Sequence, residues 1–362
     1  MRIVFTVTND LIYDQRMIRI CESLSGAGFN IKIIGVKRKD SDSLSQKKYQ
    51  QKRLFVFFTK GILFYIEYNI RLFFYLLFQK FTVICCIDLD TMLPVYLTSL
   101  IRNKIKVYDA HEYFSQQKEI VSRPAVYKVW HFIESHFLPA FKNGYTVSDS
   151  IAAEFSKLYG VNYTVIRNVP VLQYFHEIEE KEKIILYQGS VNEARGFEFL
   201  IPAMKEVNAL LFIYGNGNFW DETRKLIEDN NLQHKVFLKG KIKPDKLKEV
   251  TQKAYIGINL VEPLGFNQLY SLANKFFDYM HHAIPQVTMN FPEYKKINDE
   301  YDIALLINEL TTKNIANAIN ELLNNETKYI KLKQNCMLAR EHFTWQTEEK
   351  ILIGFYNKIT RR

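Results

Sequence analysis

Glycine, proline and cysteine are scarce in this chain of 362 residues, which has 14 glycines, 9 prolines and 4 cysteines. So few glycines and prolines exclude a collagen-like or linker-rich chain, and a hydrophobic share of 48% excludes disorder throughout. The cysteines form no CxxC pair, so a zinc site is not expected. We interpret them as buried thiols of a protein in a reducing, cytoplasmic compartment. The length favours two domains.

A long uninterrupted hydrophobic run is also absent. Residues 61–79 come closest, but Glu67, Asn69 and Arg71 interrupt them. A charge at the centre of a bilayer costs about 2.5–3.5 kcal/mol on insertion scales, so we do not expect a membrane-spanning helix. We interpret this segment as a helix that is apolar on most sides, either buried in a domain or partly laid on a membrane. The first ten residues do not resemble a signal peptide, because their apolar run is short and ends at Asp10.

Basic residues exceed acidic ones only in the first half of the chain. Residues 1–170 contain 23 basic and 14 acidic residues, whereas residues 171–362 contain 25 of each. The excess is steepest over residues 32–60, where nine basic residues face two acidic ones. This pattern favours an anionic partner such as a membrane surface, and the alternative is an ordinary solvated face. Nucleic acid is not expected as a partner, because no module that binds it is present.

Short apolar runs alternate with amphipathic stretches in two successive series. The first series predicts strands at 2–8, 31–35, 81–87, 105–109 and 144–147, and helices at 14–26, 92–101, 123–141 and 148–158. The second predicts strands at 184–189, 210–215, 236–240, 256–261 and 284–289, and helices at 196–206, 219–230, 244–251 and 272–281. Between them, residues 167–170 and the acid-rich stretch 177–182 resemble a connection. The fold class is therefore α/β, with two doubly wound, Rossmann-like domains facing a cleft.

Ligands of such sheets bind beyond the carboxyl ends of the strands, so functional residues are expected in the loops that follow the strands. Gly189 ends one strand, and Arg195 lies just before a helix that follows Gly196, which is a typical arrangement for binding phosphate. No GxGxxG dinucleotide motif is present. Ser271 is expected to cap the next helix, which would place Lys275 in its first turn and Asp278 on the same face. The simpler alternatives are an ordinary turn and a surface ion pair.

His111 follows the strand at 105–109 in a polar loop with Asp109 and Glu112, and this position favours a functional role over a core role. Asp88 and Asp90 form an Asp-x-Asp pair of the kind that binds metals. We instead interpret them as first-turn acids that complement a helix dipole.

In order and spacing, these segments resemble those of a GT-B glycosyltransferase of glycosyltransferase family 4 (group 1). The segments that carry the resemblance are 6–10, 13–17, 87–94, 107–112 and 165–170 in the first half, and 187–190, 195–196, 215–217, 271–280 and 284–285 in the second. The resemblance implies an acceptor domain at 1–170, a nucleotide-sugar domain at 171–337 and a C-terminal helical segment at 338–362 that crosses back to the first domain.

The resemblance further implies retaining transfer of a sugar from a nucleotide-sugar to a glycan or lipid-linked acceptor, in bacterial surface polysaccharide synthesis. It implies no metal ion and no cofactor, and a place in the cytoplasm, peripheral on the inner face of the plasma membrane. His111 would line the sugar pocket, Asp278 would bind the ribose hydroxyls, and Arg195 and Lys275 would carry the diphosphate. The implied donor-binding residues are Gly189, Ser190, Arg195, Gly215, Asn216, Lys239, Asn274 and Lys275, and the implied acceptor-side residues are Asn9, Asp10, Arg16 and Glu112.

Three positions depart from the family pattern. Ser190 stands where the family often has an arginine, Tyr270 where it has the first of two glutamates, and Ala283 where it usually has a glycine. Asp278 stands at the second glutamate. Ser190 and Tyr270 leave open a catalytically degenerate partner subunit as an alternative. A nucleotide-sugar 2-epimerase is a second alternative, because such enzymes share this fold.

Overall fold

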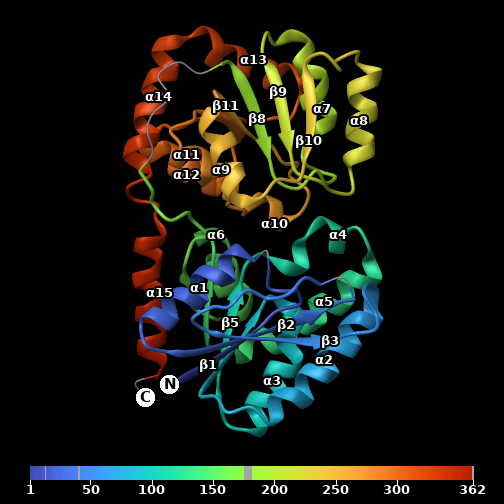
Figure 1. Ribbon diagram of the computed structural model, residues 1–362, viewed down its shortest axis with the longest axis vertical. Coiled ribbons are helices and arrows are strands. Elements are labelled where there is room, and N and C mark those ends of the chain that lie inside the picture. Colours follow the sequence, from blue (N-terminus) through green and yellow to red (C-terminus); the bar gives the residue numbers. More distant parts are fainter. Residues whose placement is uncertain (13, 40, 175–181, 361–362) are drawn as a thin grey trace. The chain divides into compact units, whose positions relative to one another are not determined.

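The computed structural model describes residues 1–12, 14–39, 41–174 and 182–360. Tyr13 of the 13–17 segment, Asp40 of the basic region and most of the predicted acid-rich connection at 177–182 lie outside the described residues. The chain divides into two compact units. The first comprises Met1–Asn168, Gly265–Asn267 and Glu348–Arg362, and the second comprises Val169–Leu264 and Gln268–Thr347. Figure 1 shows the elements of each unit.

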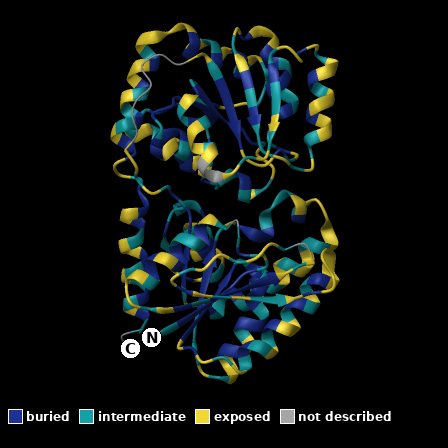
Figure 2. Ribbon diagram, in the orientation of Figure 1, coloured by how far each residue is buried: buried dark blue, intermediate teal, exposed yellow. Residues whose placement is uncertain are grey.

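The first unit is built on a parallel sheet of seven strands in the order β3-β2-β1-β4-β5-β6-β7. The strands are β1 (Arg2–Thr6), β2 (Asn30–Lys37), β3 (Gln50–Phe55), β4 (Val83–Ile87), β5 (Ile105–Ala110), β6 (Asn143–Thr146) and β7 (Thr164–Val165). All five residues of β4 are buried, as expected for a central strand that is covered on both faces. Figure 2 shows the strands of both sheets mostly in dark blue, the colour of buried residues.

Seven α-helices and three short 3-10 helices accompany this sheet among the described residues. The helices are α1 (Gln15–Gly26), α2 (Gly61–Leu77), α3 (Met92–Ile101), α4 (Lys118–Val121), α5 (Pro124–Phe137), α6 (Asp149–Tyr159) and α15 (Trp345–Thr360), with η1 (Leu89–Thr91), η2 (Phe114–Gln116) and η3 (Leu138–Ala140). The helix predicted over 123–141 ends at Phe137, and η3, which contains Pro139, follows it. Helix α15 packs on this unit through Tyr356, whose ring centroid lies 6.0 Å from that of Phe5.

The second unit has a parallel sheet of six strands in the order β10-β9-β8-β11-β12-β13. Its strands are β8 (Ile184–Gln188), β9 (Leu210–Tyr214), β10 (Val236–Gly240), β11 (Ile256–Asn259), β12 (Gln286–Met289) and β13 (Ala304–Ile307). Its helices are α7 (Phe197–Ala203), η4 (Met204–Glu206), α8 (Trp220–Asp229), α9 (Pro244–Lys253), α11 (Asn274–His281), α12 (Pro292–Tyr301), α13 (Thr312–Asn324) and α14 (Glu326–Ala339), and α10 (Phe266–Leu269) begins in the first unit. Each unit therefore has the doubly wound α/β fold that the sequence predicts.

Two local features differ from the sequence-based expectation. The basic region 32–60 contains β3, an edge strand with no fully buried residue, and so lacks the apolar pattern that would have predicted it. Helix α2 is neither wholly buried nor wholly exposed, because Phe64, Tyr68, Leu72 and Leu76 are buried and most of the intervening residues are not. No helix of the described ranges has the length and apolarity that a membrane crossing requires.

Candidate functional site

Two loops of the second unit touch through their backbones at the carboxyl ends of β8 and β9. A Cβ atom on Gly215 would lie only 1.7 Å from the carbonyl oxygen of Gly189, so no other residue fits there. Gly189 and Gly215 have φ angles of +127° and +151°. The backbones of the two loops therefore approach each other closely at Gly189 and Gly215.

In the loop after Gly189, Arg195 lies between two residues whose backbones are in the left-handed region. Ala194 and Gly196, on either side of Arg195, have φ angles of +60° and +73°. The carbonyl of Ala194 accepts a hydrogen bond from the backbone N–H of Glu262 at 3.0 Å, which fixes the loop. Arg195 is half-buried and, within the described part of the chain, has no carboxylate partner.

Lys275 lies in the first turn of α11, as predicted. Its Nζ lies 3.7 Å from the centre of the Tyr187 ring, and it would be 3.6 Å from a Cβ built on Gly189. Burial lowers the pKa of Lys275 well below its ordinary value, and Arg195 lowers it further. Among the described residues Lys275 has no ion pair with an acid, so the predicted alternative of a surface ion pair with Asp278 is wrong.

The N-terminus of α11 differs from the prediction in its cap. Ala273 is the N-cap residue and no side chain caps the helix, because the Ser271 hydroxyl donates to the carbonyl of Gln268 at 2.9 Å. The prediction that Ser271 caps this helix is therefore wrong. The positive end of the helix dipole lies beside Lys275, so two half-buried cations and an uncapped helix end gather next to Gly189.

Asp278 is held by a chain of hydrogen bonds that begins on α9. The Thr251 hydroxyl donates to Gln188 Oε1 at 2.7 Å, and Gln188 Nε2 donates to Asp278 Oδ2 at 2.8 Å. Gln188 is buried, so this chain fixes the carboxylate of Asp278 relative to the end of β8.

The other predicted donor-binding residues lie at different distances from this cluster. Ser190 and Asn216 are exposed in the two touching loops, and the Asn216 carbonyl accepts from the N–H of Val191 at 3.1 Å. Asn274 is the exposed first residue of α11. Lys239 is exposed on β10, and its Nζ lies over the rings of Phe212 and Phe237 at 4.6 and 5.2 Å.

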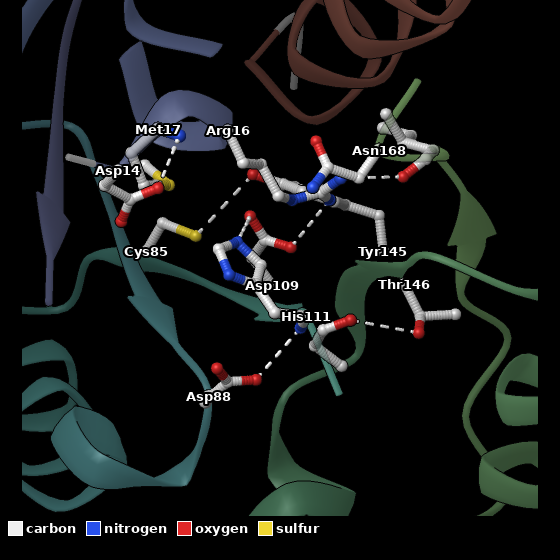
Figure 3. Close-up of polar contacts among 12 residues, drawn as sticks. Asp14, Arg16, Met17, Cys85, Asp88, Asp109, His111, Tyr145, Thr146 and Asn168 are labelled. Carbon is white, nitrogen blue, oxygen red and sulfur yellow. Dashed lines mark hydrogen bonds and ion pairs between the residues drawn. The ribbon is translucent and has the colours of Figure 1, made fainter. Parts of the chain in front are cut away.

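In the first unit, the buried ion pair of Arg16 and Asp109 lies next to His111 (Figure 3). Arg16 donates to Asp109 Oδ1 at 3.0 Å and to the carbonyl of Ile166 at 3.0 Å. Asp109 is completely buried, and its Oδ2 lies 3.3 Å from Nε2 of His111. Arg16 therefore holds Asp109, and Asp109 faces His111.

The charges of this cluster set the protonation of its members. Burial raises the pKa of Asp109, but Arg16 and His111 lower it by more, so the net pKa is below the ordinary value. Burial lowers the pKa of His111, but Asp109 raises it by more, so the net pKa is above the ordinary value. The imidazole of His111 therefore keeps its second proton up to a higher pH than an ordinary histidine does.

Of the two predicted first-turn acids, Asp90 lies in the first turn of η1 as expected, whereas Asp88 does not. Asp88 has a left-handed φ of +52° and makes no capping bond. Its Oδ1 accepts from the backbone N–H groups of His111 and Glu112 at 2.9 and 3.4 Å, so it fixes the turn that carries His111. Asp90 accepts from the hydroxyl of Thr8, and burial raises the pKa of Asp90 to about 6. The dipole interpretation is wrong for Asp88, because its carboxylate binds the neighbouring loop.

The remaining acceptor-side residues are part of the loops that surround this cluster. Asn9 Nδ2 donates to Asp14 Oδ2 at 2.7 Å, and Asp10 Oδ1 accepts from the N–H of Ile12 at 3.2 Å. Glu112 is exposed and accepts from Gln117 Nε2 at 2.7 Å. Of the four predicted acceptor-side residues, Arg16 is the one that is buried, where it supports Asp109.

Comparison with known proteins identifies the second unit. Residues 172–337 match the family model described as Glycosyl transferases group 1. The match covers most of the second unit, which is therefore similar to a group 1 glycosyltransferase domain. The predicted glycosyltransferase is thus confirmed for this domain. An uncharacterized glycosyltransferase of Methanocaldococcus jannaschii is 31% identical to the chain over 102 residues, a match that spans 26% of either chain.

Three solved structures have the same fold over nearly the whole chain. Sucrose-phosphate synthase from Thermosynechococcus elongatus has a TM-score of 0.82 at 15% identity, with 99% of both chains covered. HepE of Anabaena, in complex with UDP and glucose, has a TM-score of 0.77 at 13% identity, with 99% of this chain and 100% of that chain covered. WaaG, a glycosyltransferase involved in lipopolysaccharide biosynthesis, has a TM-score of 0.75 at 13% identity, with 97% and 100% covered. The predicted GT-B fold is therefore confirmed.

The sequence analysis did not identify the residues that contact and position Lys275 and Asp278, which are Tyr187, Gln188 and Thr251. Tyr187 and Gln188 immediately precede Gly189, and a glutamine at the end of an otherwise apolar strand was a usable signal. Thr251 lies on a different helix, and nothing in the sequence connects it to Asp278.

Proposed function

We propose that this protein is a retaining, metal-independent glycosyltransferase that moves a sugar from a nucleotide-sugar to a glycan or lipid-linked acceptor. The observation that carries the proposal is the pair Arg195 and Lys275. Both are half-buried, both lack a carboxylate partner in the described residues, and each lies beside the glycine loops. Unpaired cations in such a position are costly unless an anion binds there.

A diphosphate fits this site chemically. Arg195 can donate two parallel hydrogen bonds to phosphate oxygens, and Lys275 adds a positive charge at the N-terminus of α11. When the bond between sugar and diphosphate breaks, negative charge grows on the leaving diphosphate, and fixed cations stabilise it. In this proposal the two side chains provide the charge that a divalent ion provides in other transferases.

Asp278 and His111 are the two other side chains to which we assign a role. Asp278, which Gln188 holds in place, would accept hydrogen bonds from the ribose hydroxyls. The imidazole of His111, which Asp109 and Asp88 hold in place, would donate a hydrogen bond to the transferred sugar. We further propose that the chain works in the cytoplasm at the inner face of the plasma membrane, in surface polysaccharide synthesis. The likeness to WaaG and the basic first half support this part of the proposal.

A thermal-shift screen with UDP-, GDP- and ADP-sugars tests the donor site. A ligand at 100 times its dissociation constant adds about 2.7 kcal/mol to the free energy of unfolding, so one class of donor should raise the melting temperature. Arg195→Ala should lose this shift, whereas Arg224→Ala, an exposed arginine of the same unit, should keep it. Equal shifts in both variants would place the donor elsewhere.

The donor identified in this way then tests the reaction. With an acceptor extract, NMR of the product should show the anomeric configuration of the donor, and added EDTA should leave the rate unchanged. Inversion of the anomeric centre would refute a retaining mechanism, and loss of activity in EDTA would refute metal independence. A change of sugar configuration without any acceptor would favour the 2-epimerase, and binding without turnover would favour the degenerate partner subunit.

A further inference from the structure

The carboxyl edge of the first sheet carries three polar residues that the proposed function does not use. Arg38, Thr8 and Asp90 lie within three residues of the ends of β2, β1 and β4, which are neighbours in the sheet. Because these strands are parallel, their carboxyl ends lie along the same edge, next to β5 and the His111 that follows it. Ligands of doubly wound folds bind at this edge, so the three residues are placed where a ligand is expected.

Two arginines gather near the phenol of Tyr65 on α2. The Arg38 guanidinium lies 5.8 Å from the centre of the ring of Phe64, the residue before Tyr65, and Arg123 is the N-cap residue of α5. Burial and Asp90 raise the pKa of Tyr65 to about 12, whereas Arg123 and Arg38 lower it. Both guanidinium groups and the Asp90 carboxylate therefore lie close enough to this phenol to interact with it.

Neither arginine has a carboxylate partner within the described part of the chain. Arg38 is half-buried, and its Nε is buried without a hydrogen-bond partner there. Arg123 is exposed, and its Nε donates to the backbone carbonyl of Glu119 at 2.6 Å, which leaves the two terminal nitrogens of its guanidinium for a ligand. Guanidinium groups match the oxygens of a phosphate in charge and in geometry, so this side of the cluster favours a phosphate group.

The other side of the cluster has hydrogen-bond acceptors without donors. The Thr8 hydroxyl donates to Asp90 Oδ2, and Asn69 Nδ2 donates to the backbone carbonyl of Asp90 at 2.9 Å. Asp90 Oδ1 and Asn69 Oδ1 are buried and have no hydrogen-bond partner among the residues that the structure describes. Both residues are partly exposed, so a group at the surface can approach them. Buried acceptors without donors are costly, and hydroxyl groups of a ligand are donors that would satisfy these two.

We infer that the acceptor is a phosphorylated compound with free hydroxyl groups, whose phosphate binds Arg38 and Arg123 and whose hydroxyls donate to Asp90 and Asn69. Such a ligand supplies the anion that the arginines lack and the donors that the two acceptors lack. A divalent cation would suit Asp90 but would be repelled by both arginines. The inference rests on the proposed function for the ligand's role as acceptor of the sugar. The phosphate belongs either to a soluble sugar phosphate or to a lipid, and the probes below distinguish the two.

Calorimetric titration of the full-length chain tests the phosphate contacts. The probes are glucose 6-phosphate and dihexanoylphosphatidylinositol below its micelle concentration, and their uncharged counterparts are glucose and inositol. At least one phosphorylated probe should bind about tenfold or more tightly than its counterpart. Tighter binding of glucose 6-phosphate would assign the site to a soluble sugar phosphate, and tighter binding of the lipid to a lipid-borne phosphate. The inference is overturned if neither phosphorylated probe binds more tightly than its counterpart.

Single substitutions test the position of this site. Arg38→Ala and Arg123→Ala should each weaken binding of the tighter probe about tenfold, and Arg123 is exposed, so its loss should leave the fold intact. Lys52→Ala removes the same charge from an exposed position on edge strand β3 and should change the affinity less than about twofold. Wild-type affinity in both arginine variants would overturn the inference.

The donor site also binds phosphate in the proposed function, and Arg195→Ala separates the two sites. Probe binding that survives Arg195→Ala and is lost in Arg38→Ala supports a second site, whereas loss in Arg195→Ala alone would place the probe in the donor site and overturn the inference. A thermal shift with a nucleotide-sugar, but no binding of either phosphorylated probe, would overturn the inference and leave the proposed function standing. Probe binding without any such shift would leave this site standing and refute the proposed function.

Hexyl phosphate, whose chain carries no hydroxyl group, tests the hydroxyl contacts. The wild type should prefer glucose 6-phosphate to hexyl phosphate about tenfold. Asp90→Ala and Asn69→Ala should each lose most of this preference. Both probes use the same phosphate contacts, so a general loss of stability cancels in the ratio of their affinities. A preference that both variants retain in full would contradict the assignment of hydroxyl groups to Asp90 and Asn69.

Discussion

Replacing Lys275 with methionine should stabilise the free protein and weaken donor binding at the same time. The Lys275 ammonium lies 3.7 Å from the centre of the Tyr187 ring, and burial together with Arg195 lowers its pKa well below the ordinary value. Methionine keeps the apolar stem and removes the unfavourable charge, so the free energy of unfolding should rise by about 0.5–2 kcal/mol. The lost charge-assisted hydrogen bond to phosphate is worth about 1.5–3 kcal/mol, so affinity for a nucleoside diphosphate should fall about 10- to 150-fold.

The lowered pKa of Lys275 also determines how the free energy of unfolding and the affinity for a nucleoside diphosphate depend on pH. Between this pKa and the ordinary lysine value near 10.4, the unfolded chain binds more protons than the folded one, so the stability of the free protein rises with pH. A bound diphosphate favours the ammonium form, so binding takes up a proton in this range and the affinity falls as pH rises. Lys275→Met should lose the proton uptake and the lysine-linked part of both pH effects.

Urea unfolding and calorimetric titration, the latter in two buffers of different protonation heat, measure these effects. Lys295→Met, at an exposed lysine paired with Asp299, is the matched control and should change neither quantity much. The reasoning is refuted if Lys275→Met destabilises the protein, or if it binds the nucleotide as tightly as the wild type does.

Two further substitutions test single features of the units. Ala283→Gly should stabilise the protein by about 1 kcal/mol in urea unfolding, because Ala283 has a left-handed φ of +54°, whereas Ala153→Gly in the middle of α6 should destabilise it by a similar amount; destabilisation by both would contradict the assigned conformation. Asp109→Asn should cost about 3–5 kcal/mol, since it removes the carboxylate partner of the buried Arg16. The pKa of His111 measured by NMR should fall below its ordinary value, because burial and Arg16 then outweigh Asp88; an unchanged pKa would show that Asp109 does not control the imidazole.

Local patterns predicted the fold of each unit well. Buried strands such as β4 are continuous apolar runs, and capped helices such as α6 begin at a serine whose side chain accepts from the N–H of the third residue on. Edge strand β3 was missed because half-exposed polar residues form it. The role of Ala283 followed from the resemblance only as a departure, and its backbone shows why a glycine suits that position.

The candidate site was predictable only where its residues are neighbours in the sequence. Lys275 and Asp278 were found from their spacing, but their contacts with Tyr187 and Gln188 depend on a helix that packs against a strand about 90 residues earlier. Ser271 was predicted as a cap from local pattern, but its hydroxyl binds the preceding turn. Asp88 was misread for the same reason, because its partner is the backbone of His111 on the next strand's loop. Tertiary packing determines which partner each of these side chains binds, and the spacing of residues in the sequence does not reveal it.

The structure of the protein in complex with its nucleoside diphosphate tests the central claim most directly. We expect phosphate oxygens at about 2.7–3.0 Å from both Lys275 Nζ and the Arg195 guanidinium, next to the N-terminus of α11. A diphosphate that is bound away from these two side chains would contradict it.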